Sequence, residues 1–254
     1  MKKFICLVGA VDYGGTNEMK SEELIILHED NHVIVVLKPQ NVPSQEDSTG
    51  DKDMLTLIKE YLKEKHNKLG NVYLGLVHRL DRPTGGVMVF AKTSKAAARL
   101  SEQMRKKEIE KKYLCVTIGR PRDNRGRLIN YLEKDEKNNR VRIAPATNEN
   151  AKEAILDYVV CEDEGGYSLI EVSLVTGRPH QVRVQMANAG AVLFGDVKYG
   201  ANVGKGQNLA LFAYHLKFKH PTTDQILSFK VFPPETNPWT GFNVAKFINV
   251  AKPE

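Results

Sequence analysis

Short β-rich segments follow one another along much of this chain, often with no helical segment between them, and this constrains the fold more than any other feature. Ile170, Val172 and Leu174 alternate with Glu171 and Ser173, which is typical of a half-buried antiparallel strand. The sequence therefore predicts an α+β fold with a mostly antiparallel sheet. Strands are expected at residues 24–28, 33–37, 72–77, 86–91, 113–118, 153–161, 167–175, 209–218 and 226–232.

Helical segments are fewer than strands. An apolar stripe at residues 54–62 and a second segment after a predicted N-cap at Ser94 each indicate an amphipathic helix. Shorter helices are expected at residues 180–189 and near the C-terminus. Because the sequence holds no repeat and no long linker, we expect a tail at residues 1–20 followed by one continuous domain at residues 21–254.

The charge of the 254-residue chain is modestly basic, with a formal net charge of +6 and a pI of about 9.0. Residues 92–112 hold eight basic and three acidic side chains, and four arginines follow between residues 120 and 127. These stretches are either solvated faces or a surface that binds the phosphates of a polyanion. Charge alone leaves both interpretations open.

The cysteines and the apolar segments exclude several classes of protein. Three cysteines lie far apart without a C-x-x-C pair, which argues against a disulfide framework and against a structural zinc site. No segment approaches the length of a transmembrane helix, and the apolar run after Met1 is too short for a convincing signal peptide. We therefore expect a cytoplasmic protein that does not contact a membrane.

The densest group of reactive side chains is the run from His78 to Gly86, between two strand-like segments, where binding loops usually lie. If this run is extended, Arg79 and Asp81 point to the same side, and the guanidinium keeps the carboxylate ionised for nucleophilic attack. The alternative is a surface turn in which Asp81 only caps a neighbouring group, since surface ion pairs contribute little to stability.

Two further clusters carry polar side chains. His180 and Arg183 lie three residues apart on an expected helix and so share a face, which is either a binding face or a solvated one. No second ligand at a known spacing accompanies His180, so a metal site is not expected. In Lys111-Lys112-Tyr113, an aromatic ring beside basic residues can stack on a base. The alternative is a tyrosine packed in the core where a strand begins.

Taken in order, these clusters resemble the motifs of the RluA-type pseudouridine synthases. The resemblance runs from Val33 to about Pro233, which is most of the chain. Lys38-Pro39 is similar to the first motif of that family. The other matching segments are His78-Arg79-Leu80-Asp81-Arg82-x-Thr-x-Gly, Lys111-x-Tyr113, Gly177-Arg178-x-His180-Gln181-x-Arg183-Val184, and Gly195-Asp196 with Tyr199-Gly200.

The resemblance implies an RNA-modifying enzyme with a large mixed sheet, flanking helices and a central RNA-binding cleft, and with no metal or organic cofactor. It makes Asp81 the catalytic residue and Arg183 the arginine that pairs with this carboxylate. Tyr113 would stack on the flipped uracil, and Arg79 would push into the RNA stack that the target base leaves. Further RNA contacts are expected from His78, Arg82, His180, Lys106 and Lys107.

The reaction of such an enzyme breaks the N1–C1′ bond of a uridine and joins C5 to C1′, after the base is extruded at a cost of about a few kcal/mol. Three routes stay open, because Asp81 can attack uracil C6, attack ribose C1′, or remove a sugar proton to give a glycal. The expected substrate is structured RNA, either large-subunit ribosomal RNA or tRNA. We expect a monomer without an obligate protein partner.

Two other functions fit the same residues less well. A glycosidic-bond hydrolase usually needs two carboxylates at a set separation, and Asp81 is the one well-placed carboxylate in these motifs. A catalytically inactive RNA-binding protein on the same fold would need no carboxylate facing a polyanion. Release of free uracil would identify the hydrolase, and an Asp81→Asn variant that behaves as the unaltered protein does would identify the inactive binder.

Overall fold

The computed structural model describes residues 4–8, 20–202 and 206–248, and the contacts between residues divide the chain into two compact units. Unit 1 comprises residues 1–110, 213–234 and 252–254, and unit 2 comprises residues 111–212 and 235–251. Each unit combines strands with helices, so the predicted α+β class is confirmed. The sequence analysis predicted a boundary at residue 20, between a tail and one domain. This boundary does not correspond to the division into two units, and it stays a prediction.

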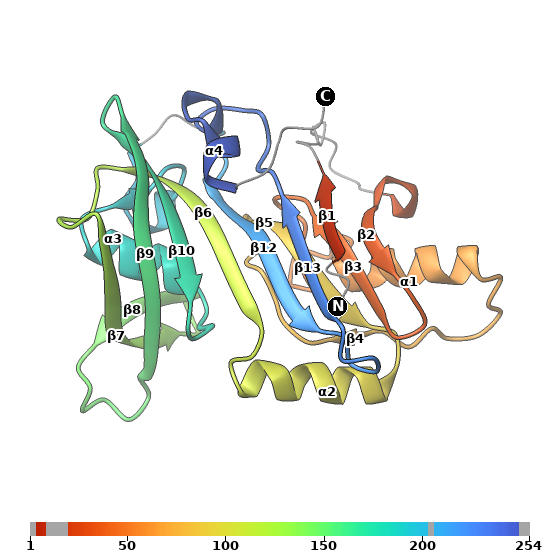
Figure 1. The fold of residues 1–254 in the computed structure, drawn as a ribbon. Coiled ribbons are helices and arrows are strands. Elements are labelled where there is room, and N and C mark those ends of the chain that lie inside the picture. Colours follow the sequence, from red (N-terminus) through yellow and green to blue (C-terminus); the bar gives the residue numbers. More distant parts are fainter. Residues whose placement is uncertain (1–3, 9–19, 203–205, 249–254) are drawn as a thin grey trace. The chain divides into compact units, whose positions relative to one another are not determined.

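Unit 1 is built on a mixed, mostly antiparallel sheet in the order β2-β3-β5-β12-β13-β1, with β4 paired to β5 (Figure 1). The strands are β1 (Phe4–Val8), β2 (Ile25–Glu29), β3 (Val33–Lys38), β4 (Gly75–Leu76), β5 (Gly85–Ala91), β12 (Leu211–Lys219) and β13 (Ile226–Val231). Strand β1, which lies within the predicted tail, pairs with β13 in parallel. Every residue of β3 and β5 is buried, which explains why both strands are apolar apart from Lys38 at the end of β3.

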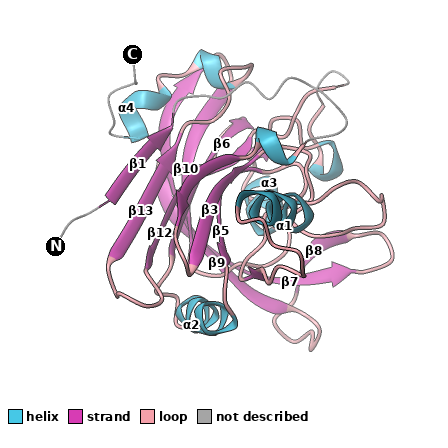
Figure 2. Ribbon diagram, turned by 90° about the vertical axis from the view of Figure 1, so that its right-hand side faces the viewer, coloured by secondary structure: helices cyan, strands magenta, loops and turns pink. Residues whose placement is uncertain are grey.

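Helix α1 (Met54–Lys65) packs on one face of this sheet (Figure 2). Asp53 caps the helix, because its carboxylate accepts hydrogen bonds from the backbone N–H groups of Leu55 at 2.8 Å and Thr56 at 3.2 Å. The apolar stripe predicted from the sequence is confirmed. The buried side chains of this helix are Met54, Leu57, Ile58 and Leu62.

Helix α2 (Ser94–Arg105) contacts β4 and β5. Its N-cap is Thr93, whose hydroxyl accepts a hydrogen bond from the Ala96 N–H at 3.1 Å, so the predicted N-cap at Ser94 is wrong by one residue. Gln103 is buried on the inner face. It can be buried because its amide donates to the Lys219 carbonyl at 2.9 Å and accepts from the Lys219 N–H at 3.0 Å.

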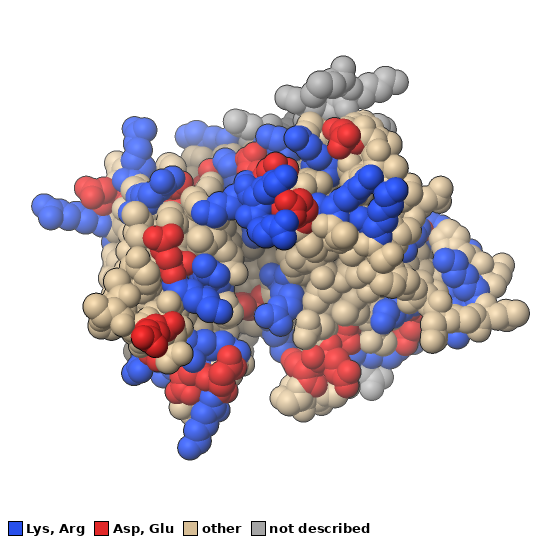
Figure 3. All heavy atoms as spheres, turned by 90° about the horizontal axis from the view of Figure 1, so that it is seen from below, with Lys and Arg blue, Asp and Glu red and all other residues tan. Residues whose placement is uncertain are grey.

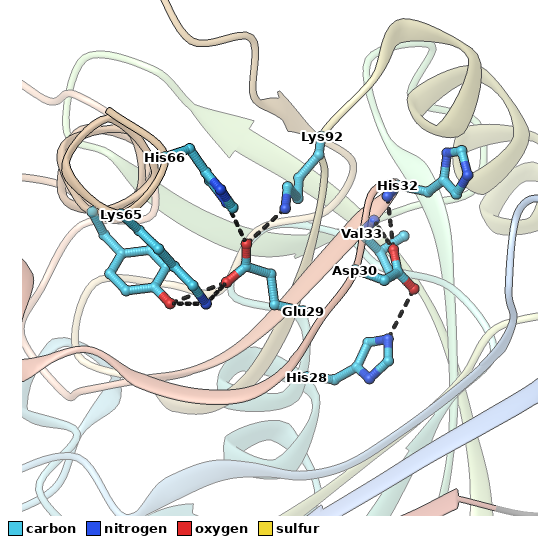
Figure 4. Close-up of polar contacts among 9 residues, drawn as sticks. His28, Glu29, Asp30, His32, Val33, Lys65, His66 and Lys92 are labelled. Carbon is cyan, nitrogen blue, oxygen red and sulfur yellow. Dashed lines mark hydrogen bonds and ion pairs between the residues drawn. The ribbon is translucent and has the colours of Figure 1, made fainter. Parts of the chain in front are cut away.

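The carboxylate of Glu29 joins β2 to α1 and to the end of β5 (Figure 4). It bonds with the hydroxyl of Tyr61 at 3.0 Å, with Lys65 Nζ at 2.8 Å, with His66 Nε2 at 3.1 Å and with Lys92 Nζ at 2.7 Å. Burial by itself would raise the pKa of Glu29, but these partners outweigh burial and lower the pKa to about 2. The ionised carboxylate is therefore the form that the fold stabilises.

The next residue, Asp30, closes the turn between β2 and β3 (Figure 4). Its carboxylate accepts hydrogen bonds from the backbone N–H groups of His32 at 2.7 Å and Val33 at 2.9 Å, and it lies 3.0 Å from His28 Nε2. Burial raises the pKa of Asp30, but the two backbone hydrogen bonds and His28 lower it by more. Glu29 and Asp30 thus fix the first hairpin of the sheet.

Stability at acid pH tests the Glu29 network. Because the folded-state pKa of about 2 lies below the ordinary value of 4.5, the network stabilises the fold above about pH 4.5 and this contribution is lost as the pH falls to about 2. We expect Glu29→Gln to lower the free energy of unfolding near neutral pH by about 1–3 kcal/mol. Denaturant titrations at a series of pH values measure this difference, which should vanish near pH 2.

The matched control is Glu60→Gln, because Glu60 pairs with Lys52 at 3.0 Å on the exposed side of α1. An exposed ion pair contributes about 0–1 kcal/mol, so this variant should stay close to the parent at every pH. A loss of stability in Glu29→Gln that is the same at acid and neutral pH would contradict the assignment of the effect to the ionised network.

Unit 2 is built on an antiparallel sheet in the order β6-β10-β9-β7-β8, with β11 paired to β6. Helix α3 contacts β7 and β8, and the opposite face of the sheet exposes Ile129 and Val159. The elements are β6 (Glu110–Ile118), β7 (Arg125–Asp135), β8 (Arg140–Ala144), β9 (Lys152–Glu164), β10 (Tyr167–Leu174), β11 (Val192–Leu193), α3 (Gln181–Asn188) and α4 (Val244–Ile248). No helix in the described ranges is both long and apolar enough to span a membrane.

Candidate active site

Asp81 lies in a loop between β4 and β5 whose main chain is held on both sides of this residue. Ser44 Oγ donates to the Leu80 carbonyl at 2.8 Å and accepts from the Leu80 N–H at 3.2 Å. On the other side, the Thr84 N–H donates to the Asp81 carbonyl at 2.9 Å. The surface turn that the sequence analysis offered as an alternative is therefore present. However, the residues that hold it, Ser44 and Leu80, are buried, and Asp81 itself is partly buried.

The fully buried Lys38 holds the main chain of this loop. Its Nζ donates to the carbonyl groups of Pro39 at 2.8 Å, Arg82 at 3.0 Å and Thr84 at 2.8 Å. These three acceptors match the three N–H donors of a charged lysine. Burial lowers the pKa of Lys38 to about 7, while the negative charge of Asp81 acts in the opposite direction. Lys38 is thus electrostatically coupled to Asp81.

The other residues of the His78–Gly86 run have distinct surroundings. Arg79 is exposed, whereas the Arg82 guanidinium is paired with Asp47 and Asp51. His78 Nε2 accepts a hydrogen bond from the Val89 N–H at 3.1 Å, which assigns the proton of the neutral ring to Nδ1. The backbone contact shows that His78 has a structural role, and its predicted RNA contact stays a prediction.

Gly86 ends this run at a position that only glycine can occupy. Its φ of +132° is rarely adopted by other residues, and a Cβ atom there would lie 2.4 Å from the carbonyl oxygen of Ala213 on β12. Because β12 passes so close to the start of β5, the loop enters the sheet at one fixed place. This contact sets the position from which the Asp81 loop leaves the sheet.

Tyr113 lies on β6 of unit 2, opposite Val172 of β10, and is 6% exposed. Two residues earlier, Lys111 reaches the Gly-Arg-x-His segment, since a Cβ atom on Gly177 would lie 3.3 Å from Lys111 Nζ. Burial lowers the pKa of Lys111. The structure therefore brings together two of the clusters that the sequence analysis singled out, Lys111-x-Tyr113 and the segment before α3.

His180 is the N-cap of α3 and adopts the left-handed conformation, with a φ of +51°. Its Nδ1 lies 2.7 Å from the hydroxyl of Tyr199, and this hydroxyl accepts the Val141 N–H at 2.9 Å. The Tyr199 hydroxyl thus joins the His180 ring to the main chain of β8. The left-handed backbone at a non-glycine residue is a strained feature, and such features cluster at functional sites.

Arg183 forms a buried, two-pronged ion pair with Asp196. Arg183 Nε donates to Oδ2 at 2.8 Å and an Nη atom donates to Oδ1 at 2.7 Å, with side-chain exposures of 8% and 1%. The guanidinium also lies 5.1 Å from the centre of the Tyr199 ring. Tyr199 thus joins His180 to Arg183, and Asp196 fixes the direction of the guanidinium.

The sequence analysis included Gly195-Asp196 and Tyr199 in the resemblance but gave neither side chain a role. The sequence could have indicated that Asp196 and Tyr199 contact an arginine, because a carboxylate and an aromatic ring close together in a motif are suitable partners for a guanidinium. The predicted pairing of Arg183 with Asp81 stays a prediction. The same holds for the roles assigned to Asp81, Tyr113 and Arg79.

Lys106 and Lys107 lie at the C-terminal end of α2, and both are exposed. Lys106 shares Glu102 with Arg105, so one carboxylate meets two cations here. Figure 3 shows the face seen from below Figure 1, the side on which α2 lies, and Lys and Arg side chains are numerous on this face, with Asp and Glu side chains among them. Arg105, Lys106 and Lys107 are consecutive at this helix end, and their predicted contact with RNA stays a prediction.

Comparison with known proteins places the chain in a family. The family model described as RNA pseudouridylate synthase matches residues 32–188. An uncharacterized RNA pseudouridine synthase of Bacillus subtilis, YhcT, is 32% identical, and the match covers 81% of this chain and 67% of the relative. The ribosomal large subunit pseudouridine synthase D of Zymomonas mobilis is 32% identical over 86% of this chain and 72% of that protein.

A solved structure has the same fold. The human RNA pseudouridylate synthase domain containing 4 is similar with a TM-score of 0.71 at 22% sequence identity, over 91% of this chain and 95% of that one. The predicted fold and the predicted family are confirmed. With its ordered motifs and its fold, this chain belongs to the RNA pseudouridylate synthase family.

Proposed function

We propose that this chain isomerises uridine to pseudouridine in large-subunit ribosomal RNA, and that it acts as a monomer in the cytoplasm. The name of the Zymomonas mobilis relative supports this substrate class. The observation that carries the proposal is the buried support of the Asp81 loop, where Lys38 binds the carbonyls of Arg82 and Thr84 and is electrostatically coupled to Asp81.

Asp81, Tyr113 and Arg183 carry the reaction in this proposal. Asp81 acts as an ionised nucleophile or base on the extruded nucleotide, and Arg183 fixes the orientation of that carboxylate. Tyr113 holds the uracil ring and takes part in removing the proton from C5. The exposed Arg79 fills the gap that the flipped base leaves. His78 and His180 contact the RNA near the flipped nucleotide.

The chemistry conserves mass apart from an exchange of hydrogen with water. The N1–C1′ bond breaks, the C5–C1′ bond forms, the proton on C5 leaves, and N1 gains a proton. RNA that carries tritium at uridine C5 therefore releases tritium in proportion to turnover. All three routes for Asp81 require a carboxylate next to the nucleotide, and Lys38, when protonated, favours the ionised form of this carboxylate.

Mapping of pseudouridine in cellular RNA, with and without the gene for this chain, tests the proposed substrate. We expect one or a few pseudouridines in large-subunit ribosomal RNA to disappear with the gene and to return when the gene is restored. Loss confined to tRNA would contradict the ribosomal substrate while keeping the activity. An unchanged map in both RNA classes would contradict the proposed function.

The basic end of α2 supports a phosphate-binding role for this helix. We expect the double variant Lys106→Glu, Lys107→Glu to weaken RNA binding at physiological salt and to reduce the slope of log affinity against log salt by about 1.5, since each phosphate contact contributes about 0.7–0.9. Filter binding to a ribosomal RNA transcript over a range of salt concentrations measures both quantities. Turnover at saturating RNA should be unchanged.

Charge reversal of Lys134 and Lys137 is the matched control, because both are exposed, Lys134 near the end of β7 and Lys137 in the turn that follows it in unit 2. It makes the same change in net charge, so a larger loss of affinity in the α2 variant assigns the effect to the helix. If both double variants bind RNA as the parent does, α2 makes no phosphate contact.

A further inference from the structure

Arg82, which directly follows Asp81, is held by the loop between β3 and α1. One Nη atom donates to Thr49 Oγ1 at 2.7 Å and lies 3.3 Å from Asp47 Oδ2, and the other donates to Asp51. We call Asp47, Thr49 and Asp51 the arginine clamp. A guanidinium presents its donors in a fixed fork, so three acceptors from one loop define its direction.

The arginine clamp is organised by its own hydrogen bonds. Asp47 Oδ1 accepts from the Thr49 N–H at 3.0 Å and from the Thr49 hydroxyl at 2.5 Å. The Asp51 N–H donates to Thr49 Oγ1 at 3.3 Å, and Gly50 has a φ of +77° that lets the loop turn back. The acceptors are thus in place for Arg82, which reduces the entropy cost of the contact.

The charges of the clamp disfavour an RNA contact by Arg82. Two carboxylates face one guanidinium, so the group as a whole is negative. Hydrogen bonds from Thr49 and Arg82 lower the pKa of Asp47 and Asp51, which keeps both ionised near neutral pH. A phosphate that approached Arg82 would have to displace these carboxylates and would be repelled by them.

Arg82 is also fixed at its main chain, because its carbonyl accepts a hydrogen bond from the buried Lys38 Nζ at 3.0 Å. Leu80, on the other side of Asp81, is held by Ser44 at 2.8 Å and 3.2 Å. Both neighbours of Asp81 are therefore anchored. Arg82 is anchored twice, because its carbonyl binds Lys38 and its guanidinium binds the arginine clamp.

We propose that Arg82 is a positioning residue, which the arginine clamp holds so that the adjacent Asp81 carboxylate keeps the geometry that the reaction requires. This inference rests on the proposed function, in which Asp81 is catalytic. It assigns Arg82 to the placement of the carboxylate rather than to the RNA contact expected from the sequence. The clamp residues Asp47 and Asp51 become determinants of the reaction rate, although neither touches the reacting atoms.

A positioning role and an RNA-contact role for Arg82 predict opposite results in a kinetic test. The test uses two variants, Arg82→Gln and the double clamp variant Asp47→Asn, Asp51→Asn. The measured quantities are tritium release from a large-subunit ribosomal RNA transcript with tritium at uridine C5, and RNA affinity by filter binding. For a positioning role, both variants lose about ten-fold or more in rate at saturating RNA, because a misplacement of about 1 Å can cost about 10²-fold. Neither variant loses RNA affinity.

A second measurement needs no RNA. The Thr84 N–H donates to the Asp81 carbonyl at 2.9 Å, so its hydrogen exchange reports on the turn that holds Asp81. We expect faster exchange at residues 81–84 in both variants and no change in Arg142→Gln. Arg142 is the control because it is an arginine of β8 that pairs with a carboxylate, that of Glu133 on β7 at 2.8 Å, in unit 2 and away from the clamp.

The contradicting results are distinct. If Arg82→Gln weakens RNA binding at an unchanged saturating rate, while the clamp variant with its free guanidinium binds RNA more tightly, Arg82 is an RNA ligand and the inference is overturned. Unchanged exchange at residues 81–84 overturns it as well. If the parent releases no tritium from any RNA, the proposed function itself fails, and the exchange experiment still shows whether the clamp holds the turn.

Discussion

The Asp81→Asn variant should fold, bind RNA and form no measurable pseudouridine. The amide has nearly the shape of the carboxylate but lacks its charge and nucleophilicity, and each of the three chemical routes requires one or both. We expect the rate to fall by about 10³-fold or more, since a nucleophile or general base contributes about 10²–10⁴-fold or more. Single-turnover tritium release from ribosomal RNA measures this rate, and filter binding measures affinity separately.

Asp163→Asn is the matched control for this variant. Asp163 is a partly exposed aspartate that pairs with Arg120 and accepts the Ser168 hydroxyl at 2.5 Å, and it lies on β9 of unit 2, outside the motifs. It should keep the parent rate. Conversion by folded Asp81→Asn at an undiminished rate would exclude Asp81 as the catalytic carboxylate, and equal inactivity of the parent would favour the inactive RNA-binding alternative.

Loss of the Arg183–Asp196 pair should cause the largest change in stability. Replacing Arg183 by Met leaves the Asp196 carboxylate, which is 1% exposed, without its two hydrogen bonds. Breaking a buried ion pair in this way costs about 3–5 kcal/mol. We expect the melting temperature to fall by about 10 °C, because one kcal/mol corresponds to about 2–4 °C in a chain of this size. Calorimetry or thermal denaturation followed by circular dichroism measures it.

The double variant Arg183→Met, Asp196→Leu separates the structural role of Arg183 from its catalytic one. Replacing both charges with apolar groups is often nearly neutral, so most of the lost stability should return. Activity should not return, because the proposed role of Arg183 toward Asp81 needs the guanidinium. A double variant that regains both stability and activity would show that Arg183 only supports the fold.

The local pattern of the sequence predicted the elements whose burial follows a simple rule. The apolar runs of β3 and β5 and the stripe of α1 are buried as expected, and the helix expected at residues 180–189 is α3 with its two caps. Strands β7 and β8 were missed, because β7 alternates exposed and partly buried positions and carries many charges. Arg127 can lie on β7 because Asp157 of β9 pairs with it at 2.7 Å.

The supports of the site could not be predicted, because they join residues that are far apart in the sequence. Lys38 contacts the loop carbonyl of Thr84, and Arg183 contacts Asp196, only after the sheet of each unit has formed. The arginine clamp on Arg82 has the same origin. Motif order predicted which residues carry the chemistry, whereas tertiary contacts decide which residues hold them in place.

Nucleoside analysis of RNA treated with this protein tests the central claim most directly. Ribosomal RNA is incubated with the parent protein or with Asp81→Asn, digested to nucleosides, and separated with mass detection that also covers free uracil. The account predicts that the parent forms pseudouridine in an amount equal to the uridine lost, with no free uracil, and that the variant forms none. Free uracil with an abasic site would show glycosidic hydrolysis instead and would contradict the account.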